Sequence, residues 1–194
     1  MYGAVDLLIV GQFGSVADVS AVSTGSQIMS SITAMINGLT MGITILIGQK
    51  LGEGNKKDAG NVVGSGISIF TIIAIITTIV VVIFSSYITA LMQAPEEAFN
   101  STVSYLKICG MGSIFIVAYN VIGGVFRGLG DSKTPLITVF IACVVNIIGD
   151  LIFVGVFKMA ATGAAYATVL GQISSAMLLF VFHIKLNKEF EHEF

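Results

Sequence analysis

The sequence predicts an all-α membrane protein, a six-helix transmembrane bundle whose first helix is truncated. The chain of 194 residues is 55% hydrophobic and only 10% charged, whereas a soluble domain carries about 25% charged residues. Its mean hydropathy is +0.96. The charged residues cluster in short stretches that are separated by long uncharged runs. Apolar runs of about 20 residues have the length that a helix needs to cross the hydrocarbon core of a bilayer.

The first apolar segment, residues 1–13, is too short to cross about 30 Å at 1.5 Å per residue. We interpret it as a helix whose first half is missing, in preference to a re-entrant segment. It has no basic start and no small-residue cleavage pattern, so it does not resemble a signal peptide. Five full-length spans are predicted after it, at about residues 20–49, 59–85, 98–126, 135–157 and 162–183.

Three of these spans begin at residues that favour helix starts. Asp58 is a candidate N-cap for the third helix, because its side chain can accept a hydrogen bond from the first turn. Pro95 suits the first turn of the next helix, where no backbone N–H is needed. Pro135 does the same for the fifth span, and Asp131 and Ser132 before it are candidate caps. The short connections predict antiparallel neighbouring helices.

Glycine spacing predicts where helices approach one another closely. Among the 22 glycines, Gly38 and Gly42 form one pair four residues apart, and Gly60 and Gly64 form another. Further small faces occur at Gly110 and Gly112, at Gly123 and Gly124, and at Gly163. Such pairs allow two helix backbones to meet, so we expect helix contacts there. A short internal echo also occurs, in which Leu-Gly-acid closes the second span at residues 51–53 and the fourth at residues 129–131.

The distribution of basic residues predicts the orientation. Seven of the nine Lys and Arg residues lie in the connections that follow the second, fourth and sixth segments, whereas Lys107 and Lys158 lie on the opposite side. By the positive-inside rule, the seven-residue side and the C-terminus face the cytoplasm. A net charge of −2 without a basic face gives no indication of nucleic-acid binding. Cys109 and Cys143 lie inside spans, where we interpret them as small apolar residues.

Two acids fall inside the predicted spans, Asp6 and Asp150. An ionised acid at the centre of a membrane helix costs on the order of 2.5–3.5 kcal/mol, so each is a functional hypothesis. Asn146 precedes Asp150 by four residues, which places both on one face of a helix. Thr168 and Gln172 have the same spacing in the last span. Gln27 and Asn37 in the second span and Asn120 in the fourth add further polar positions, and with Gln172 they are candidates to line a cavity.

The chemistry of these residues favours a monovalent cation or a proton. Two carboxylates in a low-dielectric site repel each other and resist ionising together, so they suit a shared proton or a small cation. Carboxylate, amide and hydroxyl oxygens are hard ligands, suited to Na⁺ and not to zinc or copper. The sequence contains no metal-site spacing of His or Cys, no nucleophile–base pattern and no nucleotide motif. We therefore expect a protein that is not an enzyme and that binds no cofactor and no metal beyond Na⁺.

Several stretches make the chain resemble the multidrug and toxic compound extrusion (MATE) family of antiporters. The most specific is the loop after the fourth span, whose motif residues are Arg127, Gly130, Asp131, Lys133, Thr134 and Pro135. The stretch Asn146-xxx-Asp150, the stretch from Gly163 to Thr168 and the loop at residues 47–59 are also similar to the family. Members have twelve helices in two six-helix lobes, with a substrate cavity between the lobes.

The resemblance implies that residues 1–183 are the N-terminal lobe of a twelve-helix transporter in the cell membrane. Residues 184–194 are then a cytoplasmic tail or an inter-lobe linker, and a C-terminal lobe is the missing partner. The implied function is cation-coupled antiport, with Na⁺ or H⁺ as the coupling ion, that exports amphipathic organic cations. The residues that correspond to the family's cation site are Asp6, Asn146, Asp150 and Thr168.

Two alternatives remain open from the sequence. The chain could be a truncated, non-transporting membrane module or a half-transporter subunit, because half of the first helix and the second cavity wall are missing. It could also be a lipid-linked oligosaccharide flippase of the same superfamily. The scarcity of basic residues inside the spans disfavours a cavity built for pyrophosphate.

Overall fold

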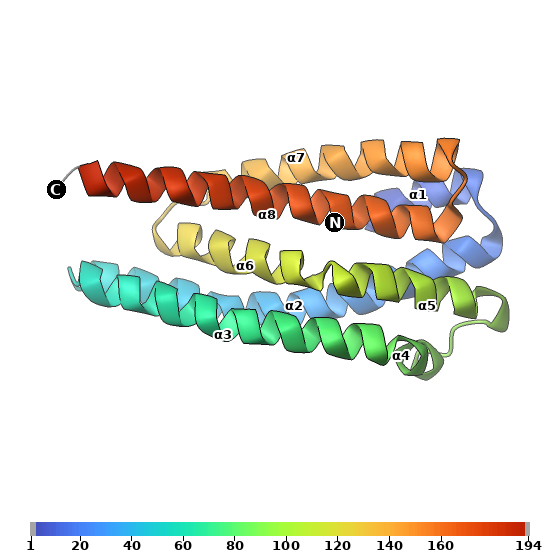
Figure 1. Cartoon of the computed structure of the whole chain (residues 1–194), viewed down its shortest axis with the longest axis horizontal. Helices are drawn as coiled ribbons and strands as arrows, with labels where there is room; N and C mark the ends of the chain where they lie inside the picture. The colour runs from blue at the N-terminus through green and yellow to red at the C-terminus, as the bar shows by residue number, and fades with distance from the viewer. Residues whose placement is uncertain (1–2, 193–194) are drawn as a thin grey trace.

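The protein is a bundle of long, roughly parallel and antiparallel helices (Figure 1). The structure, a computed structural model, describes residues 3–192, with side chains described for residues 3–184. All regular elements in this part of the chain are helical, which confirms the predicted all-α membrane class. In order they are α1 (Gly3–Phe13), α2 (Val16–Gly52), α3 (Lys56–Ile83), α4 (Ser85–Leu91), α5 (Glu96–Met111), α6 (Ser113–Gly128), α7 (Lys133–Asp150), the π-helical η1 (Leu151–Val156) and α8 (Ala160–His192).

Among the described residues, four helices are long and apolar enough to cross a membrane: α2, α3, α7 together with η1, and α8. The pair α5 and α6 forms a fifth candidate span with a bend of 45°. Helix α1 is apolar but has only 11 residues. The predicted tail, residues 184–194, continues α8 as a helix as far as His192, and residues 193–194 lie outside the described part.

The span predicted for residues 98–126 is not one straight helix, because it bends between α5 and α6. The bend lies at Gly112, where α8 approaches closely. A Cβ atom on Gly112 would lie 2.7 Å from Val169 Cγ2 and 3.2 Å from the carbonyl oxygen of Cys109. A side chain at residue 112 would not fit against α8. The break in the span therefore coincides with the glycine that lets α8 pack closely. A further short helix, α4, follows α3 and was not predicted.

Helix α6 lies at the centre of the bundle, between α2, α3 and α8. Its closest contact with α2 involves Gly124, where a Cβ atom would lie 2.5 Å from Thr40 Cγ2, and Gly128, where it would lie 2.9 Å from Ile47 Cβ. The Thr44 hydroxyl donates a hydrogen bond of 3.0 Å to the carbonyl oxygen of Gly124 across the same interface. These two glycines, four residues apart, let the two backbones meet.

The two four-residue glycine pairs that the sequence singled out do not make such contacts, whereas Gly124, which it listed among further small positions, does. No atom lies within 4 Å of a Cβ placed on Gly38, Gly42, Gly60 or Gly64. The prediction of close helix packing at these four positions was therefore wrong. A four-residue spacing places two glycines on one face of a helix but does not say whether that face meets a neighbour.

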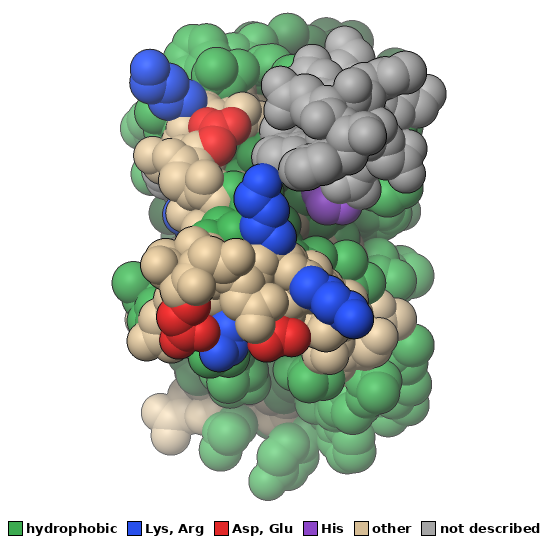
Figure 2. Space-filling model, turned by 90° about the vertical axis from the view of Figure 1, so that its left-hand side faces the viewer, with side chains coloured by type: hydrophobic (Ala, Val, Ile, Leu, Met, Phe, Trp, Pro, Cys, Tyr) green, Lys and Arg blue, Asp and Glu red, His purple; other side chains and the backbone are tan. Residues whose placement is uncertain are grey.

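The outer surface of the bundle is apolar, as expected of a protein surrounded by lipid. Leu136 and Phe140 on α7 and Ile83 on α3 are each about two-thirds exposed (69%, 70% and 67%). Charged side chains gather instead at the end that carries the α2–α3 and α6–α7 turns, where Lys, Arg, Asp and Glu side chains stand out against the hydrophobic surface (Figure 2).

The α2–α3 and α6–α7 turns share one construction. Gly54 and Gly130 have left-handed backbones, with φ of +74° and +89°. The next residues, Asn55 and Asp131, each donate a backbone hydrogen bond of 2.9 Å to the carbonyl five residues earlier, which is the bond that closes a Schellman motif. The two turns therefore correspond when residues 54–55 are aligned with residues 130–131. The predicted repeat aligned residues 51–53 with residues 129–131, which differs from this alignment by two residues.

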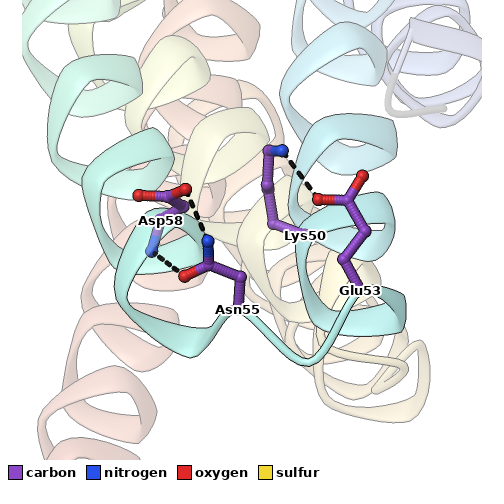
Figure 3. A network of polar contacts seen from close by, with 4 residues as sticks. All are labelled: Lys50, Glu53, Asn55 and Asp58. Atoms are coloured by element: carbon purple, nitrogen blue, oxygen red, sulfur yellow. Dashed lines mark hydrogen bonds and ion pairs between the residues drawn. The ribbon is translucent and has the colours of Figure 1, made fainter.

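The side chain of the same Asn or Asp then caps the next helix. Asn55, not Asp58 as predicted, is the N-cap of α3, because its side-chain oxygen accepts from the backbone N–H of Asp58 at 3.1 Å (Figure 3). The Asn55 amide donates back to the Asp58 carboxylate at 2.6 Å. Asp131 likewise accepts from the backbone N–H groups of Lys133 and Thr134, at 3.0 and 3.1 Å. Such caps satisfy N–H groups that have no partner within the helix.

Candidate functional site

Asp6 joins the first and last helices inside the bundle. It lies in the first turn of α1 and is completely buried. Its Oδ2 atom accepts a hydrogen bond of 2.9 Å from the hydroxyl of Thr168 on α8, 162 residues away in the chain. Its second oxygen, Oδ1, is buried and has no hydrogen-bond partner.

Asp150 and Asn146 lie on one face of α7 and are both completely buried. The Asp150 and Asp6 carboxyls are close enough to influence each other electrostatically. Neither oxygen of Asp150, and neither polar atom of the Asn146 amide, has a hydrogen-bond partner. The structure therefore brings Asp6, Asp150 and Thr168 together and places Asn146 one helical turn from Asp150.

This cluster, Asp6, Asn146, Asp150 and Thr168, is defined here as the acid site. Buried polar groups without partners cost free energy, and two neighbouring ionised carboxylates add mutual repulsion. One positive charge between the carboxyls would offset both penalties, and the Asp6 and Asp150 oxygens and the Asn146 amide oxygen offer suitable hard ligands. Among the described residues, no group of three or more His, Cys, Asp and Glu side chains could hold a metal ion.

The backbone is irregular directly beside the acid site. Helix α7 ends at Asp150 and continues as the π-helical segment η1, in which Phe157 N–H bonds to the carbonyl oxygen of Ile152, five residues earlier, at 2.9 Å. Helices α1 and α8 both pack against η1. Short π-helical turns within helices often occur at functional sites. The sequence patterns did not indicate this turn.

Tyr105 on α5 is a residue of the site that sequence reasoning did not single out. It is 1% exposed and lies beside Asp6, Thr168 and Cys109. Helix α2 makes room for its ring at Gly25, where a Cβ atom would lie only 2.4 Å from Tyr105 Cδ1. The signal was too weak to find, because one tyrosine in an apolar span belongs to no motif.

A cavity of about 380 Å³ lies next to the acid site, and Asp6, Tyr105 and Thr168 form part of its wall. Of the four residues predicted to line a cavity, Asn37, Asn120 and Gln172 do so. Gln27 does not, because it lies on an exposed part of α2 outside this wall. Asn146 and Asp150 lie outside the lining, so the cavity reaches the acid site through Asp6 and Thr168.

The cavity wall contains buried hydrogen-bond acceptors that have no partner. Several of its side-chain donors are already used: Asn120 Nδ2 donates to Ile116 O at 2.8 Å, and the Thr33 hydroxyl donates to Met29 O at 2.8 Å. The Gln172 amide oxygen, in contrast, is buried without a partner, as is Asp6 Oδ1. Among the lining residues, all within the described part of the chain, one is acidic and none is Lys or Arg. This wall is complementary to a positively charged guest with N–H donors.

The residues of the loop motif stabilise the α6–α7 turn, which lies at the opposite end of α7 from Asp150. Asp150 follows Asp131 by 19 positions, which corresponds to about 28 Å at 1.5 Å per residue. Asp131 caps α7, and the Thr134 hydroxyl that donates to its carboxylate lowers the pKa of Asp131 below its usual value. Arg127 extends back along α6, so that a Cβ on Gly123 would lie 3.3 Å from Arg127 Nη1.

Comparison with known proteins connects this fold and site to one family. A model of the MatE family matches residues 1–152. The chain is 30% identical over 182 residues to the "Probable multidrug resistance protein YoeA" of Bacillus subtilis (strain 168), covering 92% of this chain and 39% of that protein. It is 29% identical over 184 residues to the "Probable multidrug resistance protein YpnP" of the same strain, covering 95% and 41%.

A solved structure shows the same likeness in three dimensions. It is described as "Crystal structure of MATE in the bent conformation", and it superposes with a TM-score of 0.87 at 26% sequence identity. The match covers 92% of this chain and 40% of that one. The chain thus spans about two-fifths of the length of the relatives it matches.

Proposed function

The chain belongs to the MatE family, and we propose that it forms the N-terminal lobe of a cation-coupled antiporter that exports amphipathic organic cations across the cell membrane. The observation that carries this proposal is the buried pair Asp6 and Asp150. Three of its four carboxylate oxygens have no hydrogen-bond partner. Asp6 also faces the adjoining cavity. The names of the relatives, which refer to multidrug resistance, support a transporter of drugs or toxins.

In this proposal the coupling ion, Na⁺ or H⁺, binds at Asp6, Asn146, Asp150 and Thr168. The ion must bind more tightly to one conformation of the lobe than to the other, because equal affinity for both would shift no equilibrium. Helix α1 is the element that can respond, since it is connected to α8 by the side-chain hydrogen bond between Asp6 and Thr168. Occupation of the acid site then changes the cavity wall to which Asp6 belongs.

The substrate class follows from the cavity wall. An organic cation with N–H donors matches the unpartnered oxygens of Asp6 and Gln172, and its apolar body matches wall residues such as Met29 and Ile116. The partner that completes the cavity is a C-terminal lobe. By the positive-inside rule, the basic residues of the α2–α3 and α6–α7 turns support a cytoplasmic location for that end of the bundle and for the C-terminus.

Dye efflux by the full-length protein that contains this lobe tests the proposal. We expect Asp150→Asn to abolish efflux that depends on an imposed Na⁺ or pH gradient, because the amide cannot balance the charge of the ion. The matched control is Asp18→Asn, since Asp18 is a partly buried acid whose carboxylate accepts from the Ser15 backbone in the capping box at the start of α2. Unchanged efflux in Asp150→Asn would overturn the role of the acid site. The gradient that drives wild-type efflux identifies the ion.

The same assay separates the two alternative functions. A lipid-linked oligosaccharide flippase would need positive charge for pyrophosphate, and no Lys or Arg is among the lining residues of the described cavity. A non-transporting module would show no gradient-dependent efflux in any form, including the wild-type full-length protein.

A further inference from the structure

We propose that the groove between α3, α6 and α8, here called the outer groove, binds one acyl chain of a membrane phospholipid. This site is separate from the acid site and its cavity. Helix α6 contributes Val117 and Val121 to the outer groove, but Ile116 and Asn120 to the cavity, so the two lie on different faces of one helix. The proposal does not depend on transport activity.

The outer groove has a closed floor and an open rim. It encloses about 220 Å³. Phe70 and Ala74 of α3 and Val117 of α6 form part of the floor and are almost completely buried, whereas Ile114 and Phe180 at the rim are 45% and 55% exposed. The rim belongs to the apolar outer surface of the bundle, so in a membrane the groove opens to lipid. A flexible hydrocarbon chain can fill such a space with close van der Waals contact.

The polarity of the groove fits an amphiphile in one orientation. Among its lining residues, all of them described, only Thr71 and His183 carry polar side chains. The Thr71 hydroxyl donates to the carbonyl oxygen of Ile67 at 2.8 Å, so it is satisfied within α3. His183 lies edge-on to Phe126 near the α6–α7 turn, with ring centroids 6.4 Å apart. The polar end of the guest therefore lies at His183 and its apolar end at the bend between α5 and α6.

The length of the groove matches one leaflet of the bilayer. On α6 its lining runs from Ile114 to Val125, and the 11 steps of 1.5 Å between these residues correspond to about 16 Å. Half of a hydrocarbon core of about 30 Å is about 15 Å. The groove starts two residues after the break at Gly112 and reaches His183, two residues before the charged Lys185 in the sequence. An acyl chain from the leaflet on the side of the α6–α7 turn spans this distance.

The guest is a lipid and not a drug cation for an electrostatic reason. The outer groove contains no acidic side chain among its lining residues, all of which are described, so it offers a cation no counter-charge. The cavity on the other side of α6 contains Asp6 and attracts cations instead. The two spaces therefore select different classes of molecule.

Tryptophan fluorescence tests the proposal, because the chain contains no tryptophan of its own. Phe180→Trp places a reporter at the rim of the groove, and Phe140→Trp places one on the exposed surface of α7, outside the groove. Each variant of the complete chain, in detergent micelles, is titrated with phosphatidylcholine brominated at the middle of its acyl chains. Bromine quenches the indole only when the lipid lies beside it.

We expect half-maximal quenching of Phe180→Trp at about a tenfold lower lipid concentration than that of Phe140→Trp, which corresponds to about 1.4 kcal/mol of preferential binding. Adding Ala118→Leu, which fills the groove, should remove this difference without changing the Phe140→Trp curve. Superimposable curves for the two reporters, or early quenching that Ala118→Leu leaves intact, would overturn the assignment. Ile114→Trp at the inner end of the groove repeats the test if Phe180→Trp does not fold.

Discussion

The hydrogen bond between Thr168 and Asp6 allows a quantitative prediction. Thr168→Val keeps the size and branching of the side chain but removes the hydroxyl that donates to Asp6 Oδ2 at 2.9 Å. The threonine is only 8% exposed, so water cannot readily replace it. Since Asp6 Oδ1 has no partner already, the substitution leaves the whole carboxyl without a side-chain donor.

The energy of this bond is expected to be smaller in a membrane than in a soluble protein. A hydrogen bond to a charged group contributes about 1.5–3 kcal/mol in soluble proteins. Side-chain hydrogen bonds between membrane helices average about 0.6 kcal/mol and reach about 1.7 kcal/mol, because the unfolded chain in the membrane also finds partners. We therefore expect a coupling energy of about 0.6–1.7 kcal/mol between the two side chains.

A double-mutant cycle of Thr168→Val and Asp6→Ala measures this coupling through reversible unfolding in mixed micelles. Thr102→Val is the matched control. Its hydroxyl is also buried but donates to the carbonyl oxygen of Ala98 in its own helix, at 2.9 Å, so its coupling to Asp6→Ala should be near zero. Equal coupling for both threonines would refute the view that the bond between α1 and α8 stabilises the site.

Two further predictions concern packing and capping. Gly124→Ala should lower the free energy of unfolding by about 1–3 kcal/mol, because its Cβ would lie 2.5 Å from a side chain of α2. Gly38 faces open space, so Gly38→Ala should not destabilise the protein. Equal losses of stability for the two variants in unfolding titrations would contradict this packing. Asp131→Ala should cost about 0.5–2 kcal/mol through the lost cap of α7, and Ser132→Ala, whose side chain makes no capping bond, should cost little. Since the folded state lowers the pKa of Asp131, the stabilisation is present above the unfolded-state pKa and is lost as the pH falls through the folded-state pKa. Unfolding titrations between neutral and acidic pH should therefore converge for wild type and Asp131→Ala, and a constant difference would be inconsistent with the cap.

The sequence was sufficient to identify the apolar spans and the helix face that carries two residues of the acid site. Apolar runs located the spans, and a four-residue spacing placed Asn146 and Asp150 on one face. The contact between Asp6 and Thr168, in contrast, joins segments 162 residues apart. Only the family resemblance grouped these two residues in advance, because no local pattern encodes which faces of α1 and α8 meet.

The features that were missed depend on how helices pack. The sequence marked Gly112, Gly124 and Gly38 alike as positions for helix contact. Only the packing decides that α8 crosses at Gly112 and that Gly124, and not Gly38, meets a neighbouring helix. The π-helical turn after Asp150 changes backbone hydrogen bonding without a change in composition. Tyr105 became visible only once Gly25 was seen to make room for its ring.

The proposed function requires Asp6 and Asp150 to hold one cation between them. Infrared difference spectroscopy of the chain, titrated with acid and then with Na⁺, follows the carbonyl stretch of a protonated carboxyl group. We predict a carboxyl signal that vanishes when the pair releases its proton or exchanges it for Na⁺. It should be missing from Asp150→Asn and Asp6→Asn, and retained in Asp18→Asn. Identical difference spectra for wild type and Asp150→Asn would show that Asp150 does not take part in holding the cation or proton.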